Sequence, residues 1–170
     1  MRGAVLGACL LAWLADPAAA QPTPAEPTLE QILAPRGWVA VQLRENAMSQ
    51  LEADLVIEGE HRVRAQVSTS FSKSIFDQKT VRSFGLPIEP SNIEITGAKG
   101  KQRLGSVQLQ SMAFGETVVG PVTVFTADLS ELVSLGPGGQ APQAVLGSDF
   151  LTKYQAVLEI ANSKLHLRVR

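Results

Sequence analysis

Residues 51–71 read LEADLVIEGEHRVRAQVSTSF, and this stretch decides the fold. Residues 51–57 and 62–67 alternate apolar and polar side chains, which is typical of β-strands with one buried face. Gly59 lies between the two runs and can adopt the positive φ that a tight turn needs. The segment is therefore predicted to form a β-hairpin whose second strand leads into a loop rich in hydroxyl groups, beginning at Ser68.

The same alternation recurs along most of the chain. Further strands are predicted at 38–43, 93–96, 102–112, 118–126, 156–160 and 164–169. Short helices are predicted at 77–84, ended by Gly85, and at 149–154. Many short strands with few helices indicate a compact, mostly β barrel or sandwich.

The composition suits one globular domain and excludes some partners. The chain has 170 residues, a formal charge of −1 and 45 % hydrophobic residues, enough for a substantial core. Because Lys and Arg are not clustered, no nucleic-acid partner or acidic membrane surface is predicted.

The first twenty residues are predicted to be a secretory signal peptide. Arg2 precedes an apolar run over 4–15, and three alanines at 18–20 provide the small residues that precede a signal-peptide cleavage site. Asp16 and Pro17 interrupt the run, so it is too short to span a bilayer. We therefore expect export, most simply to a bacterial periplasm, and no integral membrane segment after removal of the signal.

The single cysteine, Cys9, would leave with residues 1–20. Lipidation there is disfavoured because most of the apolar run follows the cysteine instead of preceding it. The mature protein would then have no disulfide, thiolate nucleophile or cysteine-based metal site. Residues 21–36 read as a Pro-rich leader, in which Thr28 could cap one or two helical turns, and the domain spans 37–170.

The C-terminal segment carries a family resemblance. Residues 145–151 read VLGSDFL and, with the strands at 154–160 and 165–167, they resemble the end of single-domain retropepsin-like aspartic proteases. There two apolar residues and a glycine, here Val145, Leu146 and Gly147, precede a short helix that would contain Asp149. The upstream order is similar as well, including the hairpin at Gly59. The resemblance implies a closed β-barrel with one or two short helices.

The resemblance also implies a peptide-binding cleft under a flap. Residues 95–100 read ITGAKG and are similar to the glycine-bearing flap of that family. Gly97, Lys99 and Gly100 are therefore expected to contact a bound peptide, together with Phe71 beside the catalytic loop.

The departure from the family falls on the catalytic triplet. Where the family has Asp-Thr-Gly, this chain has Ser68-Thr69-Ser70. The family's aspartates, one from each lobe or subunit, share a proton and activate a water, and a serine hydroxyl does not ionise near operating pH. Thr69 keeps the capacity to hydrogen-bond, whereas Ser70 and Phe71 would crowd a position that normally holds glycine. No active catalytic residue is expected.

Other residues do not replace the missing base. Asp77 and Asp149 are expected to cap helices, and His61 and His166 to be exposed strand residues. A serine triad built on Ser68 would need partners that the linear sequence does not bring together. No metal site and no cofactor are predicted, because the mature chain offers two histidines and no cysteine.

The sequence thus predicts an exported, inactive protease homologue that binds a peptide or protein segment by β-addition. One alternative is an active aspartyl peptidase, either because a partner chain supplies the aspartate or because the catalytic triplet aligns with the family in a different register. Another is a structural β module of the cell envelope. A homodimer fits the family, in which each short chain supplies half a site, and the oligomeric state is left open.

Overall fold

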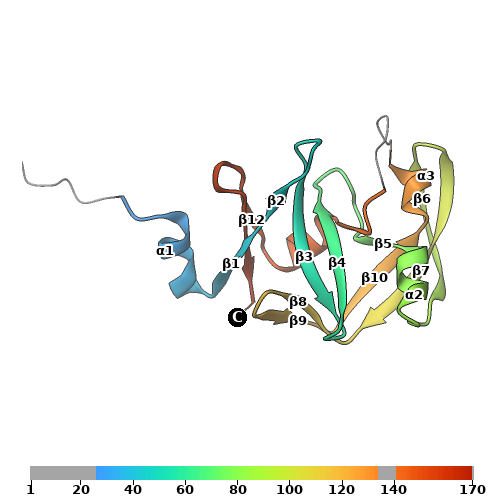
Figure 1. Cartoon of the computed structure of the whole chain (residues 1–170), viewed down its shortest axis with the longest axis horizontal. Coiled ribbons are helices and arrows are strands. Elements are labelled where there is room, and N and C mark those ends of the chain that lie inside the picture. The colour runs from blue at the N-terminus through green and yellow to red at the C-terminus, as the bar shows by residue number, and fades with distance from the viewer. Residues whose placement is uncertain (1–25, 134–140, 170) are drawn as a thin grey trace, which may run out of the picture.

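The computed structural model describes residues 26–133 and 141–169 (Figure 1). The predicted signal peptide and the start of the leader lie outside these residues. The described part of the leader contains α1 (Leu29–Leu33) and a 3₁₀ turn, η1 (Ala34–Arg36). Thr28 caps α1 through a capping box, as predicted. Lys164 Nζ lies 2.5 Å from Glu30 Oε2 and ties this helix to the last strand.

The terminal segments build a small antiparallel sheet of three strands. Its order is β1 (Trp38–Gln42), β13 (Lys164–Arg168), β12 (Val157–Glu159). The strand β13 is central, so its side chains Leu165, His166 and Leu167 are buried. This sheet lies beside α1 at one end of the molecule.

A ten-stranded sheet forms the body of the domain. Its strands are β2 (Arg44–Glu45), β3 (Leu51–Ile57), β4 (His61–Val67), β5 (Ile75–Asp77), β6 (Glu89–Gly97), β7 (Gly100–Leu109), β8 (Met112–Phe114), β9 (Thr117–Val119), β10 (Val122–Ala127) and β11 (Ala144–Leu146). The order is β6-β7-β10-β5-β11-β4-β3-β8-β9, with β2 paired to β3. The mostly β prediction is confirmed, but the expected closed barrel is not formed by strand pairing, because the end strands β6 and β9 do not pair.

The predicted hairpin is present, with Leu55 opposite Val63 and Gly59 at φ 78°. Two predicted long strands are each divided. The first breaks at Gln110, whose backbone N–H donates to Glu58 Oε1 at 2.6 Å instead of continuing a strand. The second breaks at Pro121, which has no N–H to donate to a sheet.

Short helices pack beside strands of both sheets. The predictions for 77–84 and 149–154 correspond to α2 (Gln78–Ser83) and α4 (Ser148–Lys153). With α1 and α3 (Leu129–Leu132), four short α-helices occur in the described residues, more than the one or two expected. A second 3₁₀ turn, η2 (Ile160–Asn162), follows β12. No helix in the described ranges is long and apolar enough to cross a membrane.

Two hydrophobic clusters make up the core. The larger one packs between the sheets and α4 and includes Leu55, Phe76 and Leu165. The smaller one, which we call the second cluster, has the buried residues Ile75, Leu104, Ala127, Leu129, Leu132 and Val145, against which Phe71, Ile93, Ile95, Phe125 and Ala141 pack. Its members come from the β6–β7 hairpin, from α3 and from the loop after β4. The second cluster therefore joins three segments that sequence analysis linked to the site: the flap strand with Ile95, the loop with Phe71 and the segment that begins at Val145.

Candidate functional site

The hydroxyl loop starts where β4 ends. The strand β11 pairs in parallel with β4 and antiparallel with β5, so it separates the two strands that flank the loop. The backbone N–H of Ser68 donates to the carbonyl of Leu146, the last residue of β11, at 3.0 Å. The loop is thus placed by strand pairing directly beside the segment Val145-Leu146-Gly147.

The loop is joined to the start of α4 by a set of buried and part-buried hydrogen bonds that we call the floor, made of Phe71, Ser74, Gly147, Ser148 and Asp149. Ser74, 2 % exposed, donates its hydroxyl to Asp149 Oδ1 at 2.7 Å and accepts from the N–H of Gly147 at 3.0 Å. The N–H of Ser148 donates to the Phe71 carbonyl at 2.8 Å.

The backbone carbonyls of the loop lie so close to Gly147 that no side chain fits at this position. A Cβ on Gly147 would lie 2.8 Å from the carbonyl oxygen of Phe71 and even closer to that of Lys73. Neither backbone oxygen can move away without shifting the loop, so the floor tolerates only glycine here.

The two candidate carboxylates have different roles. Asp77 caps α2 as predicted, since its carboxylate accepts from the N–H groups of Lys79 and Thr80 at 3.1 and 3.2 Å. The prediction for Asp149 was wrong, because Gly147 occupies the N-cap position of α4. Asp149 lies in the first turn of α4, where it accepts from the Ser74 hydroxyl and from its neighbour's N–H.

The triplet itself contains no acid or base. Ser68 Oγ lies 2.8 Å from Ser70 Oγ, and both Thr69 and Ser70 are exposed. Among the described residues, no carboxylate or imidazole group hydrogen-bonds to Ser68. The Ser68 hydroxyl therefore has another hydroxyl as its partner, which cannot draw off its proton.

Neither histidine reaches the loop. His61 is at the opposite end of β4, about 20 Å from Ser68 at the usual strand rise, and it stacks on Phe84 with ring centroids 4.2 Å apart. The prediction that His166 is exposed was wrong. It is 1 % exposed on the central strand β13, and its Nε2 lies 2.9 Å from Glu159 Oε2 of the neighbouring strand β12. This hydrogen bond lowers the pKa of Glu159.

The side chains that commonly bind metal ions lie apart from one another in the described part of the chain. No group of three or more His, Cys, Asp or Glu side chains comes together there in a way that could hold a metal ion.

The flap strand shares the second cluster with the loop through Ile95 and Phe71, and the flap tip contacts α3. Gly97, Lys99 and Gly100 form the tip of the β6–β7 hairpin. The N–H groups of Ala98 and Lys99 donate to the carbonyls of Leu132 and Glu131 in α3, at 3.2 and 3.1 Å. The tip thus rests on α3.

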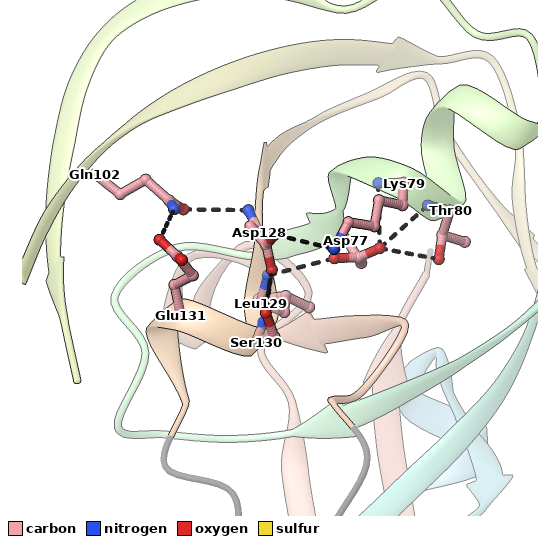
Figure 2. Close-up of polar contacts among 8 residues, drawn as sticks. All are labelled: Asp77, Lys79, Thr80, Gln102, Asp128, Leu129, Ser130 and Glu131. Atoms are coloured by element: carbon pink, nitrogen blue, oxygen red, sulfur yellow. Dashed lines mark hydrogen bonds and ion pairs between the residues drawn. The ribbon is translucent and has the colours of Figure 1, made fainter. Parts of the chain in front are cut away.

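A polar network, missed by sequence analysis, joins α2, α3 and the flap (Figure 2). Asp77 Oδ1 accepts from the N–H of Leu129 at 3.3 Å, which ties the start of α3 to the cap of α2. Asp128 caps α3 by accepting from the Ser130 N–H at 3.0 Å and from the Ser130 hydroxyl at 2.5 Å. Lys79 Nζ lies 3.1 Å from Asp128 Oδ2.

Gln102 extends this network to the flap strand β7 (Figure 2). Its Oε1 accepts from the Asp128 N–H at 3.1 Å, and its Nε2 donates to Glu131 Oε2 at 3.5 Å. The Ser130 hydroxyl, and next Lys79, hold the pKa of Asp128 below its ordinary value, while Asp128 raises the pKa of Lys79. The sequence signal was Asp-Leu-Ser-Glu at 128–131, the pattern of a helix start with an acidic residue three positions after the cap.

These features define the class of protein. The hydroxyl loop follows a strand, is hydrogen-bonded to the glycine that begins α4, and shares a hydrophobic cluster with a β-hairpin. This arrangement is the one expected from the resemblance to retropepsin-like aspartic proteases. The sequence profile described as aspartyl protease matches residues 53–150, and the chain belongs to this family. No curated protein sequence gives a significant match.

Solved structures agree on the fold. A retropepsin-like aspartic protease from Rickettsia conorii aligns with a TM-score of 0.50 and 12 % identity, covering 77 % of this chain and 90 % of that chain. The EIAV protease complexed with the inhibitor HBY-793 aligns with a TM-score of 0.51 and 14 % identity, covering 68 % and 98 %. At these identities the likeness establishes the fold alone.

Proposed function

We propose that this protein is an exported member of the aspartyl protease family that does not cleave peptides but binds an extended peptide or protein segment. The observation that carries the proposal is the position of Ser68. It follows β4 and bonds the end of β11, where sequence similarity to the family calls for the catalytic aspartate, and its hydroxyl contacts only Ser70 Oγ among the described side chains.

The family's chemistry needs a carboxylate pair that shares one proton and removes another from water. A second copy of this chain would bring another Ser68 and no carboxylate. A partner chain with an aspartate would supply one carboxylate, which still lacks the shared-proton partner. Hydrolysis by the family's route is therefore not expected in either assembly.

The surroundings of the loop support a binding role. The strand β6 is an end strand of the large sheet, and no described strand of this chain pairs with its outer edge. An extended peptide could therefore pair with that edge. Ile93 and Ile95 of this strand pack on the second cluster, as Phe71 does. We expect Phe71, Gly97, Lys99 and Gly100 to line the bound segment.

Selection from a displayed random peptide library tests this proposal. The purified protein should enrich extended peptides, and Ile95→Ala should weaken their binding by about tenfold or more through the lost apolar contact. Glu94→Ala is the matched control, since Glu94 is exposed on the opposite face of β6 and should leave binding unchanged. Cleavage of the selected peptides, or equal binding by both variants, would contradict a binding role at this site.

Export is tested separately. In a bacterial host the protein should accumulate in the periplasmic fraction, and mass spectrometry should find a mature N-terminus at or near Gln21. An intact N-terminus in the cytoplasmic fraction would overturn this part of the proposal.

A further inference from the structure

A surface groove of about 490 Å³ lies between α2 and the base of the β6–β7 hairpin, at the end of the molecule away from α1 (Figure 1). Its volume is within the range of small-molecule sites. Ser68, Phe71 and the flap tip are not among its lining residues, so it is separate from the proposed peptide site. We propose that this groove binds an aliphatic monocarboxylate, a ligand with a hydrocarbon chain and one carboxylate group.

Apolar side chains form one part of the groove. Leu86 and Ile88, in the segment that connects α2 to β6, are half-buried and pack against the larger hydrophobic cluster. Pro90 of β6 adds an exposed apolar ring. A Cβ on Gly105 of β7 would lie 2.5 Å from Ile88 Cγ2, so the hairpin is in close contact with this segment. A hydrocarbon chain that lies on these residues would leave water, which favours binding.

Two guanidinium groups stand beside this apolar part. Arg82 belongs to α2 and Arg103 to β7. Arg82 is exposed and takes part in no ion pair among the described residues. Arg103 pairs with Glu94 at 3.5 Å, but the two side chains are 68 % and 52 % exposed. Because exposed pairs contribute little to stability, a ligand carboxylate can replace Glu94 and accept two parallel hydrogen bonds from the guanidinium group.

The charge of the lining favours a ligand with a single negative charge. Glu89 is the one acid that lines the groove with Arg82 and Arg103, so these three side chains carry a net charge of +1. A monocarboxylate neutralises this charge. A phosphate dianion or a dicarboxylate would bring a second negative charge close to Glu89, and the repulsion between like charges disfavours it.

Titration of the full protein with sodium decanoate, below its micelle concentration and followed by amide NMR, tests the site. The amides of Ile88 and Gly105 should shift most, whereas those of Ser68 and Phe71 should stay in place. Octanoate, which is two methylene groups shorter, should bind about tenfold more weakly because less hydrocarbon is buried. Decylammonium has the chain length of decanoate but a positive charge, so it should bind at least about tenfold more weakly than decanoate.

Substitutions of the two arginines test the head-group contact. Arg82→Gln and Arg103→Gln should each raise the Kd for decanoate about tenfold, because each removes a charged hydrogen-bond donor. Lys101→Gln is the matched control, since it makes the same change from cation to amide at an exposed residue of β7 that does not line the groove. Its Kd should change by less than about twofold, because salt screens distant charges.

All three variants replace exposed residues, and their amide spectra without ligand report whether they are folded. Absence of shifts at Ile88 and Gly105 at millimolar decanoate would overturn the site. Equal weakening by Lys101→Gln and the two arginine variants would overturn the head-group contact, and equal binding of decanoate and either comparison ligand would overturn the ligand class. Failure of the peptide selection would leave these results unaffected, because the groove does not include the peptide site.

Discussion

The floor and the contact between the flap tip and α3 are each built around a closely packed glycine, Gly147 and Gly97, but they are held by different means. On the floor, Ser74 is 2 % exposed and makes two hydrogen bonds, and Gly147 leaves no room for a side chain. The flap tip meets α3 through two backbone hydrogen bonds and Gln102, and the exposed Lys79 of α2 pairs with Asp128 at the start of α3. The difference teaches that the buried Ser74 hydroxyl and a close backbone approach fix the base of the hydroxyl loop, whereas the Ser68 hydroxyl at its start hydrogen-bonds only to Ser70 Oγ among the described residues.

The largest effect should come from filling the floor. Gly147→Ala places a methyl group against two backbone carbonyls, so the free energy of unfolding should fall by about 3 kcal/mol. Urea unfolding measures this loss. Gly115→Ala is the comparison, because nothing lies near its Cβ and its positive φ of 59° should cost only about 1 kcal/mol. Equal losses would show that the floor is not tightly packed.

A smaller effect should distinguish two serines of the same loop. Ser74→Ala leaves the Gly147 N–H and Asp149 without their buried partner, which should cost about 2 kcal/mol. Ser68→Ala removes only the contact with Ser70 Oγ, so its cost should stay within about 0.5 kcal/mol. Urea unfolding of both variants gives the comparison directly. A larger loss for Ser68→Ala would mean that the triplet, not the floor, holds the loop.

The smallest effect on stability should come from acid at the start of α3, which Asp128 caps. The pKa of Asp128 is held below its ordinary 3.8, so its stabilising contribution is complete above that value and is lost as the pH falls through the lower folded-state pKa. Hydrogen exchange of Ala98 and Lys99, corrected for intrinsic rates, should therefore rise only below about pH 4.

Asp128→Asn is the control for this titration. Asn still caps a helix but carries no charge for Lys79, so the variant should show little of the acid-induced rise. A rise of full size in Asp128→Asn would show that protonation of Asp128 is not its cause.

The sequence predicted the parts of this molecule that depend on local pattern. The alternation over 51–67 predicted the β3–β4 hairpin, and Asp77 and Gly85 predicted the start and end of α2. The resemblance around Gly147 led to the family that the profile match shows.

The features that were missed depend on tertiary contacts. His166 alternates like an exposed residue, but it is buried and its Nε2 meets the carboxylate of Glu159 on β12, a contact that the local pattern does not report. The helix α3 has only four residues, and its stability comes from packing Leu129 and Leu132 and from capping by Asp128. The hydrogen bonds of the flap tip to α3 join segments more than thirty residues apart, which no local pattern reports.

Cleavage of a diverse peptide library by the purified protein, from about pH 3 to pH 8, tests the central claim most directly. That range covers the pKa values that an aspartyl pair would use, and circular dichroism would establish that each sample is folded. We predict no cleavage by the unmodified protein or by Ser68→Ala. Cleavage that Ser68→Ala abolishes would contradict the account and make Ser68 a nucleophile.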